Sequence, residues 1–224
     1  METKNHRKFG LSMKQKEKNL DDTLFNEVIS TYNNPHHLMH KKMVRVLKHI
    51  QPGDTLLDVG CGIGEFIVRL QDRFHTLVGV DISQPEIEFA KKRIGNSPNV
   101  FLHCGELESF HFPDEHFDVC LCLDVLEHVS TVFPLLQEIY GILRTHGDLI
   151  VTVPNWYDII VSKFLNKNPQ HVHTLTPWRW MGMLEKVGFK IRFYRAVDFP
   201  LIHSDLLPRK IPILGMCILI IAFK

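Results

Sequence analysis

Residues 56–64 read Leu-Leu-Asp-Val-Gly-Cys-Gly-Ile-Gly, a short apolar run followed by three glycines spaced two apart. This pattern predicts a strand that ends in a loop lying against a ligand, because glycine has no Cβ and adopts positive φ angles at little cost. A second apolar run, residues 76–80, ends at Asp81, seventeen residues after Gly64. The succession of strand, glycine loop, helix, strand and acid predicts a site for a nucleoside.

The spacing of the glycines separates two classes of cofactor that bind at such loops. Dinucleotide-binding folds use G-x-G-x-x-G, and the N-terminus of the following helix receives a pyrophosphate. Here Gly60, Gly62 and Gly64 are followed directly by Glu65. A carboxylate at this place stabilises the helix dipole but repels a pyrophosphate. The sequence therefore disfavours a dinucleotide, and with it a nicotinamide-dependent oxidoreductase.

The segment 58–64 closely resembles the first motif of class I S-adenosylmethionine-dependent methyltransferases, whose cofactor carries no phosphate. The resemblance implies that Asp58 approaches the methionine amino group and that Asp81 holds both ribose hydroxyls. Glu106 stands where the family often has an aspartate near the adenine amino group, and it is one methylene longer. The implied site for S-adenosylmethionine and its product S-adenosylhomocysteine comprises Asp58, Gly60, Cys61, Gly62, Gly64, Asp81, Ile82, Glu106, Leu107 and Leu123.

The order of the predicted elements indicates one fold class. Every element that the resemblance requires occurs in order between residues 54 and 155, and residues 216–223 match a last strand lying antiparallel beside the fifth. The resemblance implies an α/β, Rossmann-like fold with a seven-stranded, mostly parallel sheet, a reversed last strand and helices on both faces. The other predicted strands are residues 56–59, 76–81, 100–104, 119–123 and 148–153.

A chain of 224 residues is within the size range of one domain. We expect an N-terminal arm and cap helix over residues 1–40 and the methyltransferase domain over 41–224, with a lid insertion at about 155–180. A tail at 171–177 and 183–189 resembles ubiquinone-biosynthesis-type O-methyltransferases. The cap helix and the lid are expected to line a substrate pocket, although the lid aromatics are equally suited to packing the lid itself. The candidate substrate-binding residues are Tyr32, Asn155, Trp156 and Tyr157.

Methyl transfer from a sulfonium requires mainly positioning, and a hydroxyl acceptor also needs a general base. His128 is one candidate, because it lies just beyond the fourth strand, where the acceptor is expected. His171 and His173 lie in a loop that covers the substrate in related enzymes, and either is a candidate base instead. Each histidine also has a structural interpretation, as a residue that orders its segment through hydrogen bonds to backbone carbonyls.

No metal site is expected. Asp124, Glu127 and His128 form D-x-x-E-H, similar to a metal-binding E-x-x-E-H of some relatives, but the simpler interpretation is that Asp124 caps a helix whose dipole Glu127 stabilises. The five cysteines are interpreted as small buried hydrophobic residues in a reducing cytosol. We expect Cys120 and Cys122 to point to opposite faces of their strand.

Charge and hydropathy limit the partners. The formal net charge is +1, which gives no reason to expect a nucleic acid, so the acceptor is expected to be a small molecule. Residues 1–20 lack the apolar core of a signal peptide, and the apolar run 211–223 is too short to span a membrane. We expect a cytoplasmic monomer or homodimer. The alternatives are a nucleic-acid (tRNA) methyltransferase and a non-catalytic partner protein that keeps the methyltransferase fold.

Overall fold

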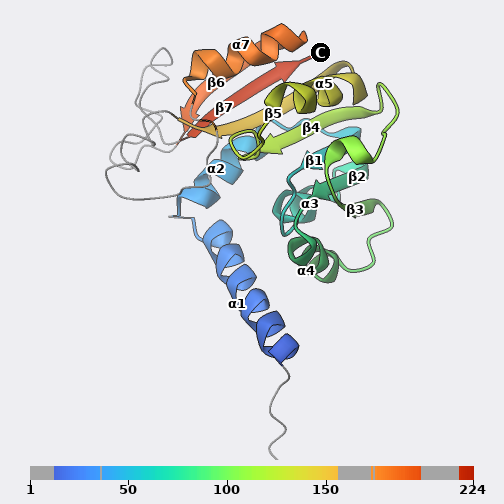
Figure 1. Cartoon of the computed structure of the whole chain (residues 1–224), viewed down its shortest axis with the longest axis vertical. Helices are drawn as coiled ribbons and strands as arrows, with labels where there is room; N and C mark the ends of the chain where they lie inside the picture. Colours follow the sequence, from blue (N-terminus) through green and yellow to red (C-terminus); the bar gives the residue numbers. More distant parts are fainter. Residues whose placement is uncertain (1–12, 36, 156–172, 174, 198–216) are drawn as a thin grey trace, which may run out of the picture.

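The computed structural model describes residues 13–35, 37–155, 173, 175–197 and 217–224. Seven strands form one sheet in the order β3-β2-β1-β4-β5-β7-β6 (Figure 1). Neighbours among β1 to β5 pair in parallel, whereas β7 is antiparallel to both β5 and β6. This confirms the expected Rossmann-like sheet with its reversed last strand. The strands are β1 (Gly53–Val59), β2 (Phe74–Asp81), β3 (Val100–Cys104), β4 (Phe117–Leu123), β5 (Leu143–Pro154), β6 (Lys190–Val197) and β7 (Cys217–Phe223).

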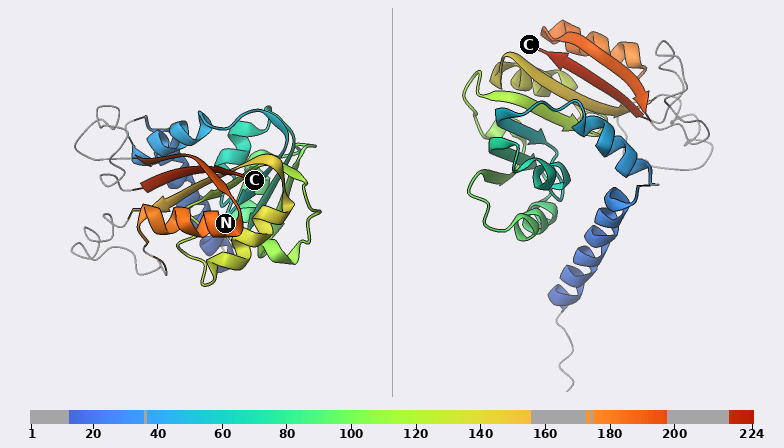
Figure 2. Two further views of the ribbon diagram at one scale, coloured as in Figure 1. Left: turned by 90° about the horizontal axis from the view of Figure 1, so that it is seen from above. Right: turned by 180° about the vertical axis from the view of Figure 1, so that it is seen from behind.

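Helices cover both faces of the sheet (Figure 2). Two separate hydrophobic clusters result, because the central strands contribute apolar side chains to each face. One cluster packs under α2 (Leu38–Leu47), α3 (Glu65–Leu70) and α4 (Gln84–Ile94). The other packs under α5 (Val132–Ile142) and α7 (Pro177–Val187), where Trp180 is almost fully buried. Because β1 to β5 are parallel, their carboxyl ends lie at the same edge of the sheet. The loops at this edge carry the candidate site.

The first helix, α1 (Met13–Asn33), extends away from the sheet (Figure 1). It contacts α4 through the rings of Phe25 and Phe89, whose centroids are 4.9 Å apart. A short bend then leads into α2, whose N-cap is His37. The boundary at residue 40 proposed from the sequence falls inside α2, and it stays a prediction.

Two local expectations differ from the structure. Residues 126–128 form a turn, and α5 begins only at Val132, so the expected helix at Asp124 is absent. Asp124 has a φ of 55°, which is not the conformation of a helix cap. The fifth strand is also longer than expected, because β5 begins directly after α5 and takes residues 145–147 into a register shift against β4.

Four of the five cysteines are buried, and Cys104 is exposed, which corrects the expectation that all five are core residues. Cys120 and Cys122 belong to the same hydrophobic cluster. The expectation that they point to opposite faces was wrong, because residues two apart in a strand share a face. Within the described parts of the chain, no helix is long and apolar enough to cross a membrane.

Candidate active site at the carboxyl edge of the sheet

The glycine loop connects β1 to α3 in a conformation that requires glycine. Gly60, Gly62 and Gly64 have φ values of 73°, 50° and 74°. Backbone N–H groups of Gly60 and Cys61 donate to the carbonyl of Val80, at 2.8 and 3.1 Å, and fix the loop to the end of β2. A Cβ on Gly60 would lie 2.3 Å from a methyl carbon of Val125, so the loop also fits closely against the turn after β4.

Asp81, the last residue of β2, is held by two backbone hydrogen bonds. Its Oδ2 accepts from the N–H of Gly62 at 2.9 Å, and its Oδ1 accepts from the N–H of Ser83 at 2.8 Å. Each carboxylate oxygen has a second lone pair available, because a carboxylate accepts about four hydrogen bonds. The geometry is therefore suited to a ligand with two adjacent hydroxyl groups.

Asp58 lies in β1 beside this loop and is only 2% exposed. Burial, with a further contribution from the Asp81 carboxylate, raises the pKa of Asp58 to about 8. A buried carboxyl group of this kind favours a cationic ligand, because a nearby positive charge stabilises the ionised form.

The other predicted donor-site residues surround the same loop in different environments. Ile82 is 76% exposed, whereas Leu107 is 3% exposed and Cys61 is 7% exposed. The Sγ of Cys61 lies 2.9 Å from where a Cβ on Gly79 would stand, which explains its burial against β2. Glu106 is exposed and is the N-cap residue of the 3-10 turn η1 (Leu107–Ser109), while Leu123 is partly buried at the end of β4.

A second group of polar side chains surrounds the turn after β4. Lys42 of α2 forms an ion pair with Oδ2 of Asp124. The Oδ1 of Asp124 accepts from the hydroxyl of Thr152 at 2.9 Å, and its N–H donates to the carbonyl of Thr152. Burial alone would lower the pKa of Lys42, but the Asp124 carboxylate outweighs it and holds that pKa above its usual value. Lys42 was not among the site residues predicted from the sequence.

Glu127 and Tyr32 adjoin this ion pair. Glu127 is 1% exposed, and its Oε2 has no hydrogen-bond partner among the described residues. Burial, followed by the Asp124 charge, raises the pKa of Glu127 to about 8. Burial likewise raises the pKa of the half-buried Tyr32 to about 12. The predicted substrate residue Tyr32 thus lies within electrostatic range of Lys42 and Asp124.

Two of the histidine candidates lie at the turn after β4, one within it and one from a segment that contacts it. His128 is exposed on the turn itself. The backbone N–H of His173 donates to the carbonyl of Glu127 at 3.1 Å, and its Nε2 lies 3.3 Å from the carbonyl oxygen of Ser130. Among the described residues, no three His, Cys, Asp or Glu side chains are arranged to hold a metal ion. Asn155 is fully buried at the end of β5, while Trp156, Tyr157, His171 and most of the expected lid lie outside the described residues.

Comparison with known proteins identifies the domain. Residues 57–151 match the family model described as a methyltransferase domain. The match runs from β1 to β5 and supports the class I S-adenosylmethionine-dependent methyltransferase domain that the sequence resembles. It contains the glycine loop, Asp81 and the turn after β4, whereas Tyr32, Lys42, Thr152 and His173 lie outside the matched region.

Relatives and a solved structure carry similar methyltransferase domains. The chain is 26% identical over 152 residues to a probable S-adenosylmethionine-dependent methyltransferase of Mycolicibacterium smegmatis, covering 68% of this chain and 58% of the relative. It is 32% identical over 147 residues to phosphoethanolamine N-methyltransferase 1 of Arabidopsis thaliana, covering 63% of this chain and 30% of that relative. The chain thus spans less than two thirds of either relative. An S-adenosylmethionine-dependent methyltransferase from Mesorhizobium loti has the same fold, with a TM-score of 0.68, 16% identity, and coverage of 82% of this chain and 98% of that chain.

The residues present fit S-adenosylmethionine, the cofactor of this family. Asp81 offers acceptor sites for a ribose diol, and the buried Asp58 suits the ammonium of the methionine part. Glu65, at the start of α3, forms ion pairs with Arg69 and Arg93, so these cations are already paired with a carboxylate beside the loop. These residues therefore fit a nucleoside without a pyrophosphate better than a dinucleotide.

Proposed function

We propose that this protein transfers the methyl group of S-adenosylmethionine to a small-molecule acceptor, with an oxygen atom as the nucleophile. The observation that carries the proposal is the fixed Asp81 carboxylate, with one oxygen hydrogen-bonded to Gly62 in the glycine loop. The sequence resemblance to ubiquinone-biosynthesis-type O-methyltransferases favours oxygen. Within this proposal, S-adenosylmethionine supplies an activated methyl group, and the chain supplies orientation worth several of the roughly 7–11 kcal/mol available in ideal cases.

His173 is the base that the geometry favours. The carbonyl of Ser130 can only accept a hydrogen bond, so an Nε2 bonded to it carries the proton. In the neutral ring, Nδ1 then has the lone pair that removes a proton from an acceptor hydroxyl. His128, exposed on the adjoining turn, is the second candidate, and His171 remains a candidate from the sequence.

A nitrogen acceptor is the second candidate function. It is supported by the 32% identity to a relative named as a phosphoethanolamine N-methyltransferase. An amine that is already neutral needs less help from a base than a hydroxyl does, so loss of both described histidines would affect the two reactions differently.

The first test is isothermal titration of the full chain with S-adenosylhomocysteine, with NAD as the control. Micromolar binding of the first ligand alone supports the donor site. The second stage measures methyl transfer to hydroxylated small molecules, amines and tRNA. Transfer to tRNA alone would contradict the small-molecule proposal, and binding without transfer to any class would favour the non-catalytic partner instead.

A further inference from the structure

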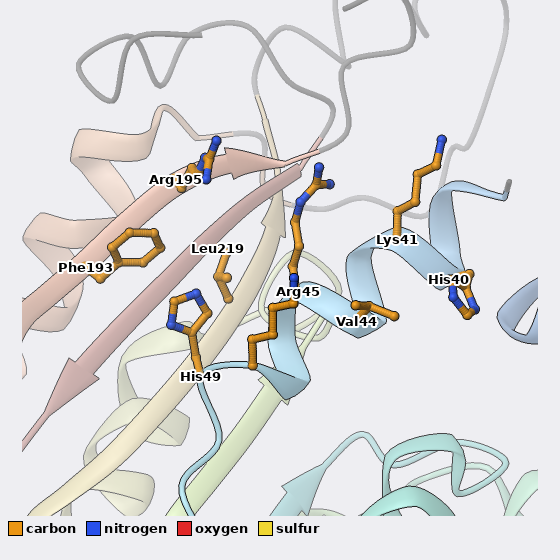
Figure 3. A pocket seen from close by; sticks show the side chains of 9 residues that line it. His40, Lys41, Val44, Arg45, His49, Phe193, Arg195 and Leu219 are labelled. Atoms are coloured by element: carbon orange, nitrogen blue, oxygen red, sulfur yellow. The ribbon is translucent and has the colours of Figure 1, made fainter. Parts of the chain in front are cut away.

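A cavity of about 300 Å³ lies between α2 and the antiparallel strands β6 and β7 (Figure 3), and its described lining residues include neither Asp81 nor any residue of the glycine loop. Its base is formed by apolar side chains of α2 and the strands, including Val44 and Leu219. Most of the other described lining residues are basic. The basic lining residues are His40, Lys41, Arg45, Lys48, His49 and Arg195. We call this cavity the basic pocket.

The concentration of positive charge in the basic pocket contrasts with the rest of the molecule. The whole chain has 26 Lys and Arg against 25 Asp and Glu. Four of these cations line the basic pocket, and the nine lining residues that the structure describes include neither Asp nor Glu. Lys41, Arg45 and Lys48 follow at intervals of four and three, which places them on one side of α2. A local excess of this kind attracts anions.

The side chains converge from two elements that are distant in the sequence. Lys41 and Arg45 extend from α2, and Arg195 comes from β6, where it pairs with Leu219 (Figure 3). Figure 3 shows the two arginines and Lys41 reaching toward the same end of the cavity. Guanidinium groups bind phosphate through paired hydrogen bonds, and an ammonium group adds a compact positive charge.

An aromatic wall accompanies the cations. The rings of His49 and Phe193 are 4.9 Å apart, with an angle of 32° between their planes. Partial burial, followed by the charges of Arg195 and Lys48, lowers the pKa of His49. The imidazole therefore experiences the positive field of the pocket, and it is a natural reporter of an anion that enters.

We propose that the basic pocket binds a small molecule that carries a phosphate group. The cavity volume is within the range of small-ligand sites. The near-zero net charge of the chain favours a compact phosphorylated ligand over a nucleic acid, which needs phosphate contacts along an extended surface. Lys41 and Arg45 line the basic pocket from one side of α2. Lys42, the next residue after Lys41, instead pairs with Asp124 in the candidate active site.

The test is titration of the full chain with inorganic pyrophosphate at constant ionic strength, followed by calorimetry. Saturable binding is expected. The variant Lys41→Gln/Arg45→Gln should weaken it by about tenfold or more, because charged hydrogen bonds are lost. The matched control is Lys91→Gln/Lys186→Gln, which removes the same charge from exposed positions on α4 and α7. Both variants should keep the thermal unfolding midpoint and the affinity for S-adenosylhomocysteine.

A second readout is the titration of His49 by NMR, with its resonance identified from its absence in His49→Gln. Pyrophosphate should raise the pKa of His49, because a bound anion stabilises the imidazolium. Absence of saturable binding, or equal weakening in the two double variants, would overturn the proposal. Binding of tRNA that depends on Lys41 and Arg45, with no binding of pyrophosphate, would also overturn it and make the pocket part of a nucleic-acid surface. Retained binding of S-adenosylhomocysteine separates each of these results from a failure of the methyl-donor site.

Discussion

The proposed donor side and the proposed acceptor side of the candidate active site are built differently. On the donor side, backbone groups hold Asp81 in place through Gly62 and Ser83, all within a short stretch of chain. On the acceptor side, side chains from distant segments meet, as in the pair of Lys42 and Asp124. The first arrangement is fixed by local conformation, and the second depends on how α2 packs. We expect donor binding to be robust to changes on the acceptor side, and the predictions below test that separation.

The largest effect is expected for Asp81→Ala. The ligand loses hydrogen bonds to a charged group, so the affinity for S-adenosylhomocysteine should fall by about 3 kcal/mol, or more than a hundredfold. Calorimetry measures this change. Asp72→Ala, which removes an exposed carboxylate, is the control and should leave affinity intact. Unchanged affinity in Asp81→Ala would mean that the ligand does not use this carboxylate.

Gly60→Ala should reduce the free energy of unfolding by about 2–4 kcal/mol, from an unfavourable positive φ and a clash with Val125. Unfolding in denaturant measures this loss of the free energy of unfolding. Val125→Ala in the same chain should restore part of the loss by removing the clashing methyl groups. The control is Gly182→Ala in α7, where a Cβ meets no atom within 4 Å and stability should hold or rise. A Gly60→Ala protein as stable as the parent would contradict the close fit of loop and turn.

The affinity for S-adenosylhomocysteine should rise by roughly tenfold or more between pH 6 and pH 8. The pKa of Asp58 is about 8 in the free protein, so Asp58 is mostly protonated below that value. A ligand ammonium favours the ionised form of Asp58, so binding releases a proton from this carboxyl group. The free energy needed to remove that proton falls as pH rises. Calorimetry in buffers of different ionisation enthalpy measures the number of protons that are released on binding. Asp58→Asn should remove the slope, and an equal slope in that variant would assign it to another group.

Asp58→Asn should also stabilise the ligand-free protein above pH 7. An acid whose folded pKa lies above its unfolded pKa lowers stability as pH rises between those two values. The gain over the parent should therefore be absent near pH 4 and reach about 1 kcal/mol or more at pH 8. Thermal unfolding across this range measures the difference. A gain that is constant with pH would indicate a packing effect instead.

The smallest effect on donor binding is expected for Lys42→Met. The pair with Asp124 is only partly exposed to water, so its loss should cost about 1–2 kcal/mol of stability, after allowance for screening at the more exposed Asp124. The affinity for S-adenosylhomocysteine should change by less than about threefold, which is below 1 kcal/mol. The double variant Lys42→Met/Asp124→Asn should recover stability. A large loss of donor affinity would show that the two sides are not separable.

The same contrast explains what the sequence could predict. The glycine loop is encoded by neighbouring residues, so its spacing, the following Asp81 and the family resemblance predict the loop and the strands around it. Lys42 was missed because 82 positions separate it from Asp124. Its place next to Met43 and four positions before Val46, on the buried side of α2, was nevertheless a usable signal. The turn at 126–128 was mistaken for a helix because D-x-x-E-H suits a helix start equally well. The spacing of Lys41, Arg45 and Lys48 was visible, but the approach of Arg195 depends on the packing of α2 beside β6.

The contact between Gly60 and Val125 also limits how such a protein can change its acceptor during evolution. Residue 125 follows Asp124 in the turn, yet its side chain touches the loop that we propose binds the methyl donor. A chimera that takes the turn from a relative must therefore bring a side chain at position 125 that this loop tolerates. Changes in acceptor specificity at this turn are therefore limited by contact with the glycine loop, which we propose keeps binding the same methyl donor.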